Sequence, residues 1–337
     1  MGRSLRLMVS LVALIGARAQ AQPGEASGAE YDTGHESQGG PVASRSLEFP
    51  VVLSDGNTYT IAGTLSCRGS VRGKTLQVAV HGATYNSDYW DVPPLNGRRY
   101  SYARYMAERG FAVLAVDQLG TGASSHPPGD FLNLSEASLG LHQVLASLRR
   151  ASNPSGVRFR RIVLVGHSNG SLTAIRAQAQ FGDADGLVVT GWVHGSVPPV
   201  DPAEFEPLLA EPYVFVPPEI RTMLFYDPPN ADPDMIAYDG ETLNDVIPRA
   251  QFLDLLTAQF FDPSLSQSVD VDVPVLVQVG DLDFLMMFAP LEGETESYPS
   301  SPDLSLQQIA GSGHSLNTHF ARQDSFRAIR RWITERF

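Results

Sequence analysis

The pentapeptide GHSNG, residues 166–170, lies between an apolar run, RIVLV (161–165), and SLTAIRAQAQ (171–180), which has the composition of a helix. A Gly-x-Ser-x-Gly match is weak evidence by itself in a chain with 30 glycines. Its setting is more specific, because a nucleophile elbow requires a buried strand, a sharp turn with serine at the apex and an immediate helix. The stretch therefore predicts Ser168 as a catalytic nucleophile.

Short apolar runs alternate with helical patterns on both sides of this motif. Their apolar residues do not alternate with polar ones, which is typical of parallel strands buried on both faces. Strands are predicted at 76–80, 111–117, 160–166, 186–193, 273–280 and 304–311, after a hairpin over 46–65, and helices at 98–110, 134–151, 171–182 and 324–337. This pattern predicts an α/β fold with helices on both faces of the sheet.

The N-terminal segment 1–21 has the pattern of a secretory signal peptide: a basic start, an apolar run at 7–17 and small residues up to Ala21. The run is shorter than the roughly 20 residues that span a bilayer, so no stable membrane anchor is expected. Residues 22–45 are rich in Gly, Ser and acids, as in disordered leaders. We expect a secreted or periplasmic protein whose folded domain covers 46–337.

The composition excludes several classes of site. A formal net charge of −13 repels polyanions and argues against nucleic acid as a partner. The chain has one cysteine, Cys67, so an internal disulfide and a cysteine-based metal cluster are both impossible. The GTG stretch at 120–122 lacks the lysine of a phosphate-binding loop. We expect no cofactor and no metal.

A serine hydroxyl is a weak nucleophile and needs a base that is itself oriented by an acid. On a nucleophile-elbow scaffold the chain order is serine, acid, histidine. Asp281 and Asp283 follow the strand 273–280, and His314 lies between small residues in a loop after the last strand. His314 is the predicted base, with His319 as its closest rival, and the residues alone leave both aspartates open.

The tetrahedral oxyanion of an acyl transfer needs two backbone N–H donors. One comes from the residue after the nucleophile, here Asn169, and the other from a loop after an earlier strand. A His-Gly pair ends the strand 76–80, which predicts Ala83 as the second donor. Gly82 would let the backbone approach the nucleophile closely.

Five motifs in this order resemble the α/β-hydrolase superfamily over residues 75–337. They are HGATYNSDYW (81–90), VDQLGTGASS (116–125), GHSNG (166–170), GDLD (280–283) and GSGH (311–314). The resemblance implies an eight-stranded, mostly parallel sheet with a cap inserted after the sixth strand, at about 197–270. It also implies that Asp283, the last residue of the Gly-x-x-Asp pattern, is the catalytic acid, and that the loop after Asp117 supports the site without being catalytic.

The resemblance further implies a lipase-like serine esterase with the triad Ser168, Asp283 and His314, which the signal-peptide pattern of residues 1–21 makes a secreted one. Aromatic residues in the cap, together with this mechanism, suggest a small or medium apolar ester as substrate. An amidase or peptidase, a cofactor-free perhydrolase and a non-catalytic binding protein of the same fold remain as alternatives. The helix before the last strand is expected to be short, because APLEGETESYPSSP (289–302) has few helix formers.

Overall fold

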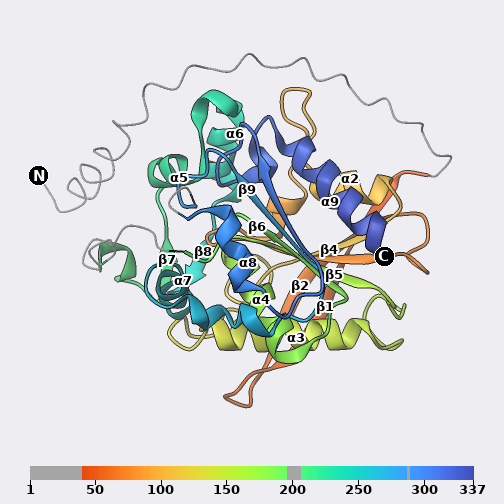
Figure 1. Cartoon of the computed structure of the whole chain (residues 1–337). Coiled ribbons are helices and arrows are strands. Elements are labelled where there is room, and N and C mark those ends of the chain that lie inside the picture. The colour runs from red at the N-terminus through yellow and green to blue at the C-terminus, as the bar shows by residue number, and fades with distance from the viewer. Residues whose placement is uncertain (1–39, 196–205, 287–288) are drawn as a thin grey trace, which may run out of the picture.

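The computed structural model describes residues 40–195, 206–286 and 289–337. Within these residues the main sheet has eight strands in the order β1-β2-β4-β3-β5-β6-β9-β10 (Figure 1). β2 pairs antiparallel with β1 and β4, and the other pairs are parallel. The strands are β1 (Val42–Val52), β2 (Thr58–Arg68), β3 (Leu76–Val80), β4 (Ala112–Val116), β5 (Ile162–His167), β6 (Gly186–Thr190), β9 (Val275–Gly280) and β10 (Leu304–Ile309). The predicted eight-stranded, mostly parallel sheet is confirmed.

The sheet separates two apolar cores, because successive side chains of a strand point to opposite faces. In β5, Leu164 belongs to one core, while Val163 and Val165 belong to the other. Helices α3 (Leu134–Leu148) and α4 (Asn169–Phe181) cover the first core, and α2 (Tyr102–Glu108) and α9 (Arg322–Arg336) cover the second (Figure 1). The expected helices on both faces are therefore present.

Between β9 and β10 lies α8 (Glu294–Ser297), which is four residues long, so the expectation of a short helix there is confirmed. None of the helices in the described part of the chain is both long and apolar enough to cross a bilayer.

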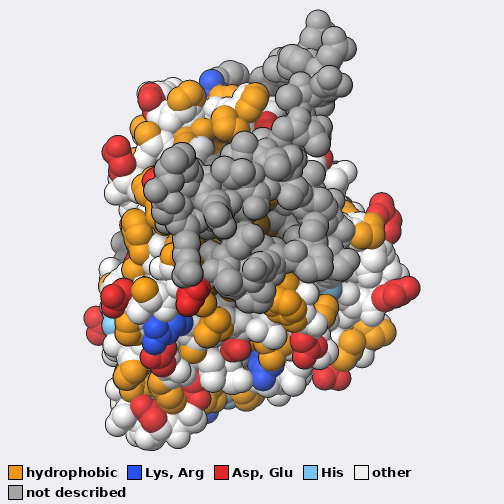
Figure 2. All heavy atoms as spheres, turned by 90° about the vertical axis from the view of Figure 1, so that its left-hand side faces the viewer, with side chains coloured by type: hydrophobic (Ala, Val, Ile, Leu, Met, Phe, Trp, Pro, Cys, Tyr) orange, Lys and Arg blue, Asp and Glu red, His pale blue; other side chains and the backbone are white. Residues whose placement is uncertain are grey.

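The cap is inserted between β6 and β9, after the sixth strand as expected. It contains a two-stranded antiparallel sheet and three α-helices in the described segment 206–274: β7 (Tyr213–Phe215), β8 (Val246–Pro248), α5 (Pro218–Phe225), α6 (Pro233–Tyr238) and α7 (Arg249–Phe260). Residues 196–205, where the cap was expected to begin, lie outside the described residues. Figure 2 faces the cap side, where hydrophobic and acidic side chains are interspersed over the described surface.

The folded domain begins earlier than the composition predicts. β1 starts at Val42 and pairs with β2 along its whole length, from Val42 opposite Arg68 to Val52 opposite Thr58. The side chains of 43–46 are polar or exposed, so no apolar pattern marks them, but a backbone ladder does not depend on side-chain polarity. The leader predicted for 22–45 is therefore wrong at its C-terminal end, and its part before residue 40 and the signal peptide lie outside the described residues.

Candidate active site

Ser168 lies at the apex of the turn between β5 and α4. Its backbone has φ 51° and ψ −120°, a conformation that L residues rarely adopt and that marks stored strain. The turn is tight: a Cβ at Gly166 would lie 2.4 Å from Ser171 Cα, and a Cβ at Gly170 would lie 2.2 Å from Val80 O. Both flanking glycines are therefore required by close approach of the backbone.

The strained turn is held by the neighbouring strand β6. The Ser168 N–H donates to Thr190 O (2.8 Å), and the Ser171 hydroxyl donates to the same carbonyl (3.0 Å). The Thr190 hydroxyl donates back to Gly166 O (2.8 Å). The Ser168 side chain is thus placed at the C-terminal end of β5, where the first N–H groups of α4 create positive potential.

The structure brings Asp283 and His314 together. His314 Nδ1 lies 2.9 Å from Asp283 Oδ2, and both side chains are buried. The other oxygen of Asp283 accepts from the N–H groups of Leu285 (3.0 Å) and Met286 (3.2 Å). An ionised carboxylate accepts only, so Nδ1 carries the proton and Nε2 keeps its lone pair.

His314 Nε2 makes no hydrogen bond to any residue in the described part of the chain. The ring of His167, which directly precedes Ser168, lies 5.0 Å from the His314 ring, so the predicted base lies beside the elbow. A bond from Ser168 Oγ to His314 Nε2 is not formed in this structure. Nucleophile–base hydrogen bonds are often long without substrate, so this geometry is compatible with a base.

Asp281 has a different position from Asp283. Its Oδ1 accepts from the N–H groups of Gly311 (2.8 Å) and Ser312 (3.3 Å), at the start of the loop that carries His314. It therefore holds that loop to the end of β9 and makes no hydrogen bond with the imidazole. Of the two aspartates that the sequence left open, the geometry favours Asp283 as the acid.

His319, the rival base, has both ring nitrogens occupied. Nδ1 donates to Ser315 O (2.8 Å), and Nε2 accepts from the Asp227 N–H of the cap (3.2 Å). The side chain is buried and stacks on Tyr226. His319 therefore joins the cap to the His314 loop and has no free nitrogen for proton transfer.

The loop that carries Ala83 runs against the nucleophile, since a Cβ at Gly82 would lie 3.2 Å from Ser168 Cβ. Asn169 is the first residue of α4, and the first N–H groups of a helix have no partner within it. Asn169 thus directly follows Ser168, and the residue before Ala83 lies against it.

His81 and Gln118 support this loop, and sequence reasoning missed both roles. His81 Nε2 accepts from the Gln118 N–H (3.0 Å), so Nδ1 carries the proton and donates to Gly82 O (2.9 Å). The Gln118 amide donates to His81 O (2.8 Å). The motif HG at the end of β3 signals this arrangement, because a buried histidine there must find partners in the next loop.

The loop after β4 is held by contacts of Asp117. Asp117 accepts from the N–H groups of Ser87 (2.7 Å) and Ala123 (2.9 Å), and a Cβ at Gly122 would lie 2.4 Å from Asp117 Cγ.

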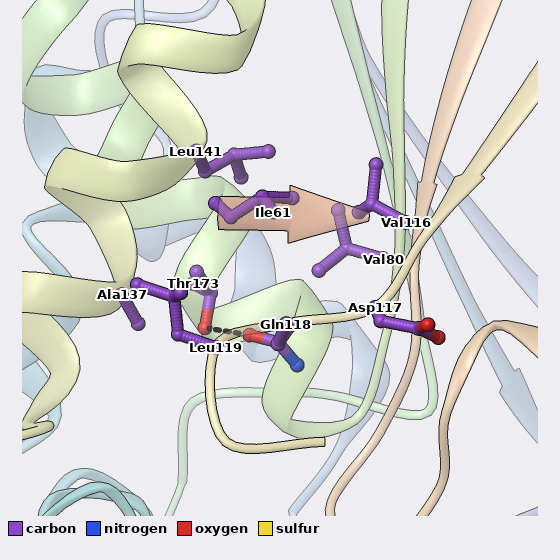
Figure 3. Close-up of a pocket in the computed structure, with 9 residues that line it drawn as sticks. All are labelled: Ile61, Val80, Val116, Asp117, Gln118, Leu119, Ala137, Leu141 and Thr173. Atoms are coloured by element: carbon purple, nitrogen blue, oxygen red, sulfur yellow. Dashed lines mark hydrogen bonds between the residues drawn. The ribbon is translucent and has the colours of Figure 1, made fainter. Parts of the chain in front are cut away.

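Behind the loop is a cavity of about 10 Å³, the space of about one water molecule (Figure 3). It is lined by Ile61, Val80, Val116, Asp117, Gln118, Leu119, Ala137, Leu141 and Thr173, and it is far too small for an ester substrate.

Ser266, His194 and Glu294 form a second serine–histidine–carboxylate set, and their contacts indicate a structural role rather than a catalytic one. His194 Nδ1 lies 2.9 Å from Glu294 Oε2, and its Nε2 lies 2.9 Å from Ser266 Oγ. Ser266 is fully buried, its hydroxyl donates to Pro263 O (2.9 Å), and it occupies no strained elbow. These contacts fix the end of β6 to the cap and to α8.

Three buried histidines make the fold sensitive to acid. Burial lowers the pKa of His81 and His319, and burial, His314 and His81 lower the pKa of His167 well below the ordinary value of 6.5. The unfolded chain therefore binds more protons, and the stability that these groups provide is full above pH 6.5 and lost as pH falls below it.

We expect the free energy of unfolding, measured by urea titration, to fall between pH 7.5 and 5.5, because the unfolded chain takes up protons that the buried rings do not. In His319→Gln, which removes one such group, the fall should be smaller than in the wild type. Equal or greater stability of the wild type at pH 5.5 would contradict the neutral state assigned to these rings.

Solved structures with the same fold include three of stated activity. An esterase from Thermogutta terrifontis is 19% identical with a TM-score of 0.62, over 86% of this chain and 98% of that one. A bromoperoxidase from Bacillus anthracis is 18% identical (TM-score 0.62; 87% and 100%), and a monoacylglycerol lipase from Paleococcus ferrophilus is 18% identical (TM-score 0.56; 88% and 99%). At these identities the likeness shows the fold. A search of the curated proteins found no match.

A family model described as "Alpha/beta hydrolase family" matches residues 77–326, which is most of the chain. The matched region runs from β3 to α9 and includes the elbow, both aspartates, His314 and the cap. The chain therefore belongs to the alpha/beta hydrolase family.

Proposed function

We propose that this protein is a serine hydrolase that cleaves a carboxylic ester of a small or medium apolar compound through an acyl-enzyme intermediate. The observation that carries the proposal is the pairing of a strained Ser168 at a helix N-terminus with a buried His314–Asp283 hydrogen bond beside it. His314 Nε2 has no hydrogen-bond partner among the described residues, so its lone pair is available to accept the proton that the reaction releases.

In the first half of the reaction, Ser168 Oγ attacks the ester carbonyl and its proton passes to His314 Nε2. Asp283 holds the Nδ1–H and stabilises the imidazolium that forms. The negative charge on the carbonyl oxygen is met by the N–H groups of Ala83 and Asn169. His314 then gives its proton to the departing alcohol, and the acyl group stays on Ser168.

In the second half, a water molecule takes the place of the alcohol. His314 Nε2 accepts a proton from the water as its oxygen attacks the acyl carbon, the same two N–H groups meet the oxyanion, and the proton returns to Ser168 Oγ as the acid leaves. The cycle balances with these side chains and water.

The surroundings of the base support an apolar substrate. The Phe225 ring lies 5.3 Å from the His314 ring and 5.8 Å from the Tyr85 ring, which places aromatic surface beside the reacting group. Tyr226, the next cap aromatic, instead packs on His319 and belongs to the internal contacts of the cap. Two of the similar structures are named as an esterase and a monoacylglycerol lipase, which is in keeping with ester chemistry on this fold.

The test is hydrolysis of p-nitrophenyl esters from acetate to long acyl chains. We expect a kcat/KM maximum at short to medium chains, at or above about 10⁴ M⁻¹ s⁻¹, the lower end for efficient enzymes. Activity restricted to anilides or peptides would replace the ester by an amide, and activity that requires hydrogen peroxide would indicate a perhydrolase. Absence of turnover together with absence of labelling by a fluorophosphonate would refute the proposal and leave a binding protein.

A further inference from the structure

The cap contributes a buried ion pair that lies against the active site. Arg221 in α5 and Asp239, at the end of α6, are each about 1% exposed. Arg221 Nε and Nη2 both donate to Asp239 Oδ1, at 3.0 and 2.5 Å. Removing two charges from water is costly, and such a pair is weak evidence of stabilisation. The other hydrogen bonds of Arg221 and Asp239 indicate a role of this ion pair other than stabilisation.

Arg221 reaches the loop that carries the oxyanion donor. Its Nη1 donates to Thr84 O (2.9 Å) and also contacts the Thr84 hydroxyl. The Asp245 N–H, also from the cap, donates to the same carbonyl (2.9 Å). Thr84 has φ 58°, which a β-branched residue adopts only when its surroundings impose it. The cap therefore holds the residue next to Ala83 in a strained conformation.

Asp239 extends the contact to the loop that carries the base. Its Oδ2 accepts from the Tyr85 hydroxyl (2.5 Å) and from the Tyr226 hydroxyl (2.8 Å). Because Tyr85 gives its proton to Asp239, it accepts from Ser315 Oγ, 2.6 Å away, and Ser315 directly follows His314. The Arg221 guanidinium carbon lies 4.4 Å from the centre of the Tyr85 ring. One buried network thus joins the cap, the oxyanion loop and the His314 loop.

We propose that Arg221 is a positioning residue that sets the oxyanion loop from the cap and, through Asp239 and Tyr85, the loop of His314. The inference rests on the proposed function for its kinetic consequences. It implies that the cap completes the catalytic centre, because two of the groups that act on the substrate are held by cap side chains.

The first test is Arg221→Lys, which keeps the charge but cannot bond Asp239 and Thr84 as the planar guanidinium does. We expect kcat on a p-nitrophenyl ester to fall about 10- to 100-fold, as for small misplacements of catalytic groups, while KM changes less than about threefold. The rate of fluorophosphonate labelling should fall in parallel, since the adduct also places an oxyanion near Ala83. Arg249→Met, which removes a more exposed cap arginine paired with Asp130, should leave both values unchanged.

A matched pair of tyrosines keeps the test valid should Arg221→Lys fail to fold. Tyr85→Phe and Tyr226→Phe each remove one hydroxyl from the same Asp239 oxygen, but Tyr85 lies in the oxyanion loop and bonds Ser315. We expect the loss in kcat to be at least fivefold greater for Tyr85→Phe, on the order of the loss for one hydrogen bond. Equal losses in both variants would overturn the positioning role.

Amide hydrogen exchange of residues 81–86, followed by mass spectrometry, does not require turnover. Faster exchange in Arg221→Lys than in wild type is the expected result, and unchanged exchange or unchanged kcat would overturn the inference. Wild-type protein without esterase activity or labelling, but with the expected exchange difference, would refute the proposed function and leave the positioning of the loop supported.

Discussion

Ser168→Ala is expected to abolish ester hydrolysis, with kcat lowered by roughly 10⁶-fold, as for the nucleophile of other serine hydrolases. The reason is specific to the elbow: Ser168 occupies the apex with φ 51°, and the neighbouring Ser171 hydroxyl is committed to Thr190 O. The described part of the elbow therefore offers no second hydroxyl for attack. Initial rates on the best p-nitrophenyl ester, per mole of protein measured by absorbance, give the loss, and fluorophosphonate labelling of the wild type alone counts its active sites.

Ser138→Ala is the matched control, because Ser138 is also a fully buried serine, with its hydroxyl bonded to Leu134 O in α3. Its loss should cost about 1 kcal/mol of stability and leave kcat within about twofold. Residual turnover of Ser168→Ala above a hundredth of wild type, in protein that melts cooperatively, would show that another group is the nucleophile.

Asp283→Asn is expected to lower kcat about 10⁴-fold, the loss seen when an orienting aspartate becomes an amide. The amide group of the variant side chain would donate to Nδ1 of His314, so the ring proton would move to Nε2, the atom that must accept the proton of Ser168. In the wild type, Asp283 Oδ1 accepts from the N–H groups of Leu285 and Met286. The amide oxygen of the variant can accept from the same two groups, so the loop should keep its shape. kcat and the thermal midpoint of the same preparation check both statements.

Asp281→Asn is the same substitution two residues away. The amide oxygen can still accept from the N–H groups of Gly311 and Ser312, so the His314 loop should stay in place. We expect kcat to fall less than about tenfold, since the imidazole loses no partner. A loss equal to or greater than that of Asp283→Asn would show that the acid has been assigned to the wrong residue.

The sheet and the elbow could be predicted from the sequence because their signals are local. The residues of β5 are apolar at successive positions, which predicts a buried strand. Both glycines of GHSNG are required by close backbone contacts, and the motif itself indicates that requirement. The polar start of β1 carries no such signal. It is a strand because its backbone pairs with β2, and the partner of Val42 is 26 residues away at Arg68.

The candidate site could be predicted in part. Ser168, Asp283 and His314 each lie in a loop that follows a parallel strand, β5, β9 or β10, at the same edge of the sheet. Their motifs and their order along the chain therefore identify all three residues. The role of Arg221 could not be predicted, because it bonds Thr84 across 137 residues and no spacing in the cap singles it out. From the sequence alone, an arginine in a proline-rich insertion is expected at the surface. Only the tertiary contacts show that Arg221 is buried.

The buried pair of Arg221 and Asp239 also limits how the protein can be re-engineered. A grafted cap that lacks the equivalents of Arg221 and Asp239 would leave Thr84 at positive φ without its side-chain donor from the cap, and the Tyr85 hydroxyl without its acceptor. The cap and the loop 81–86 therefore form one exchangeable unit, and a chimera that aims at a new substrate range needs its junctions placed so that both segments come from the same parent.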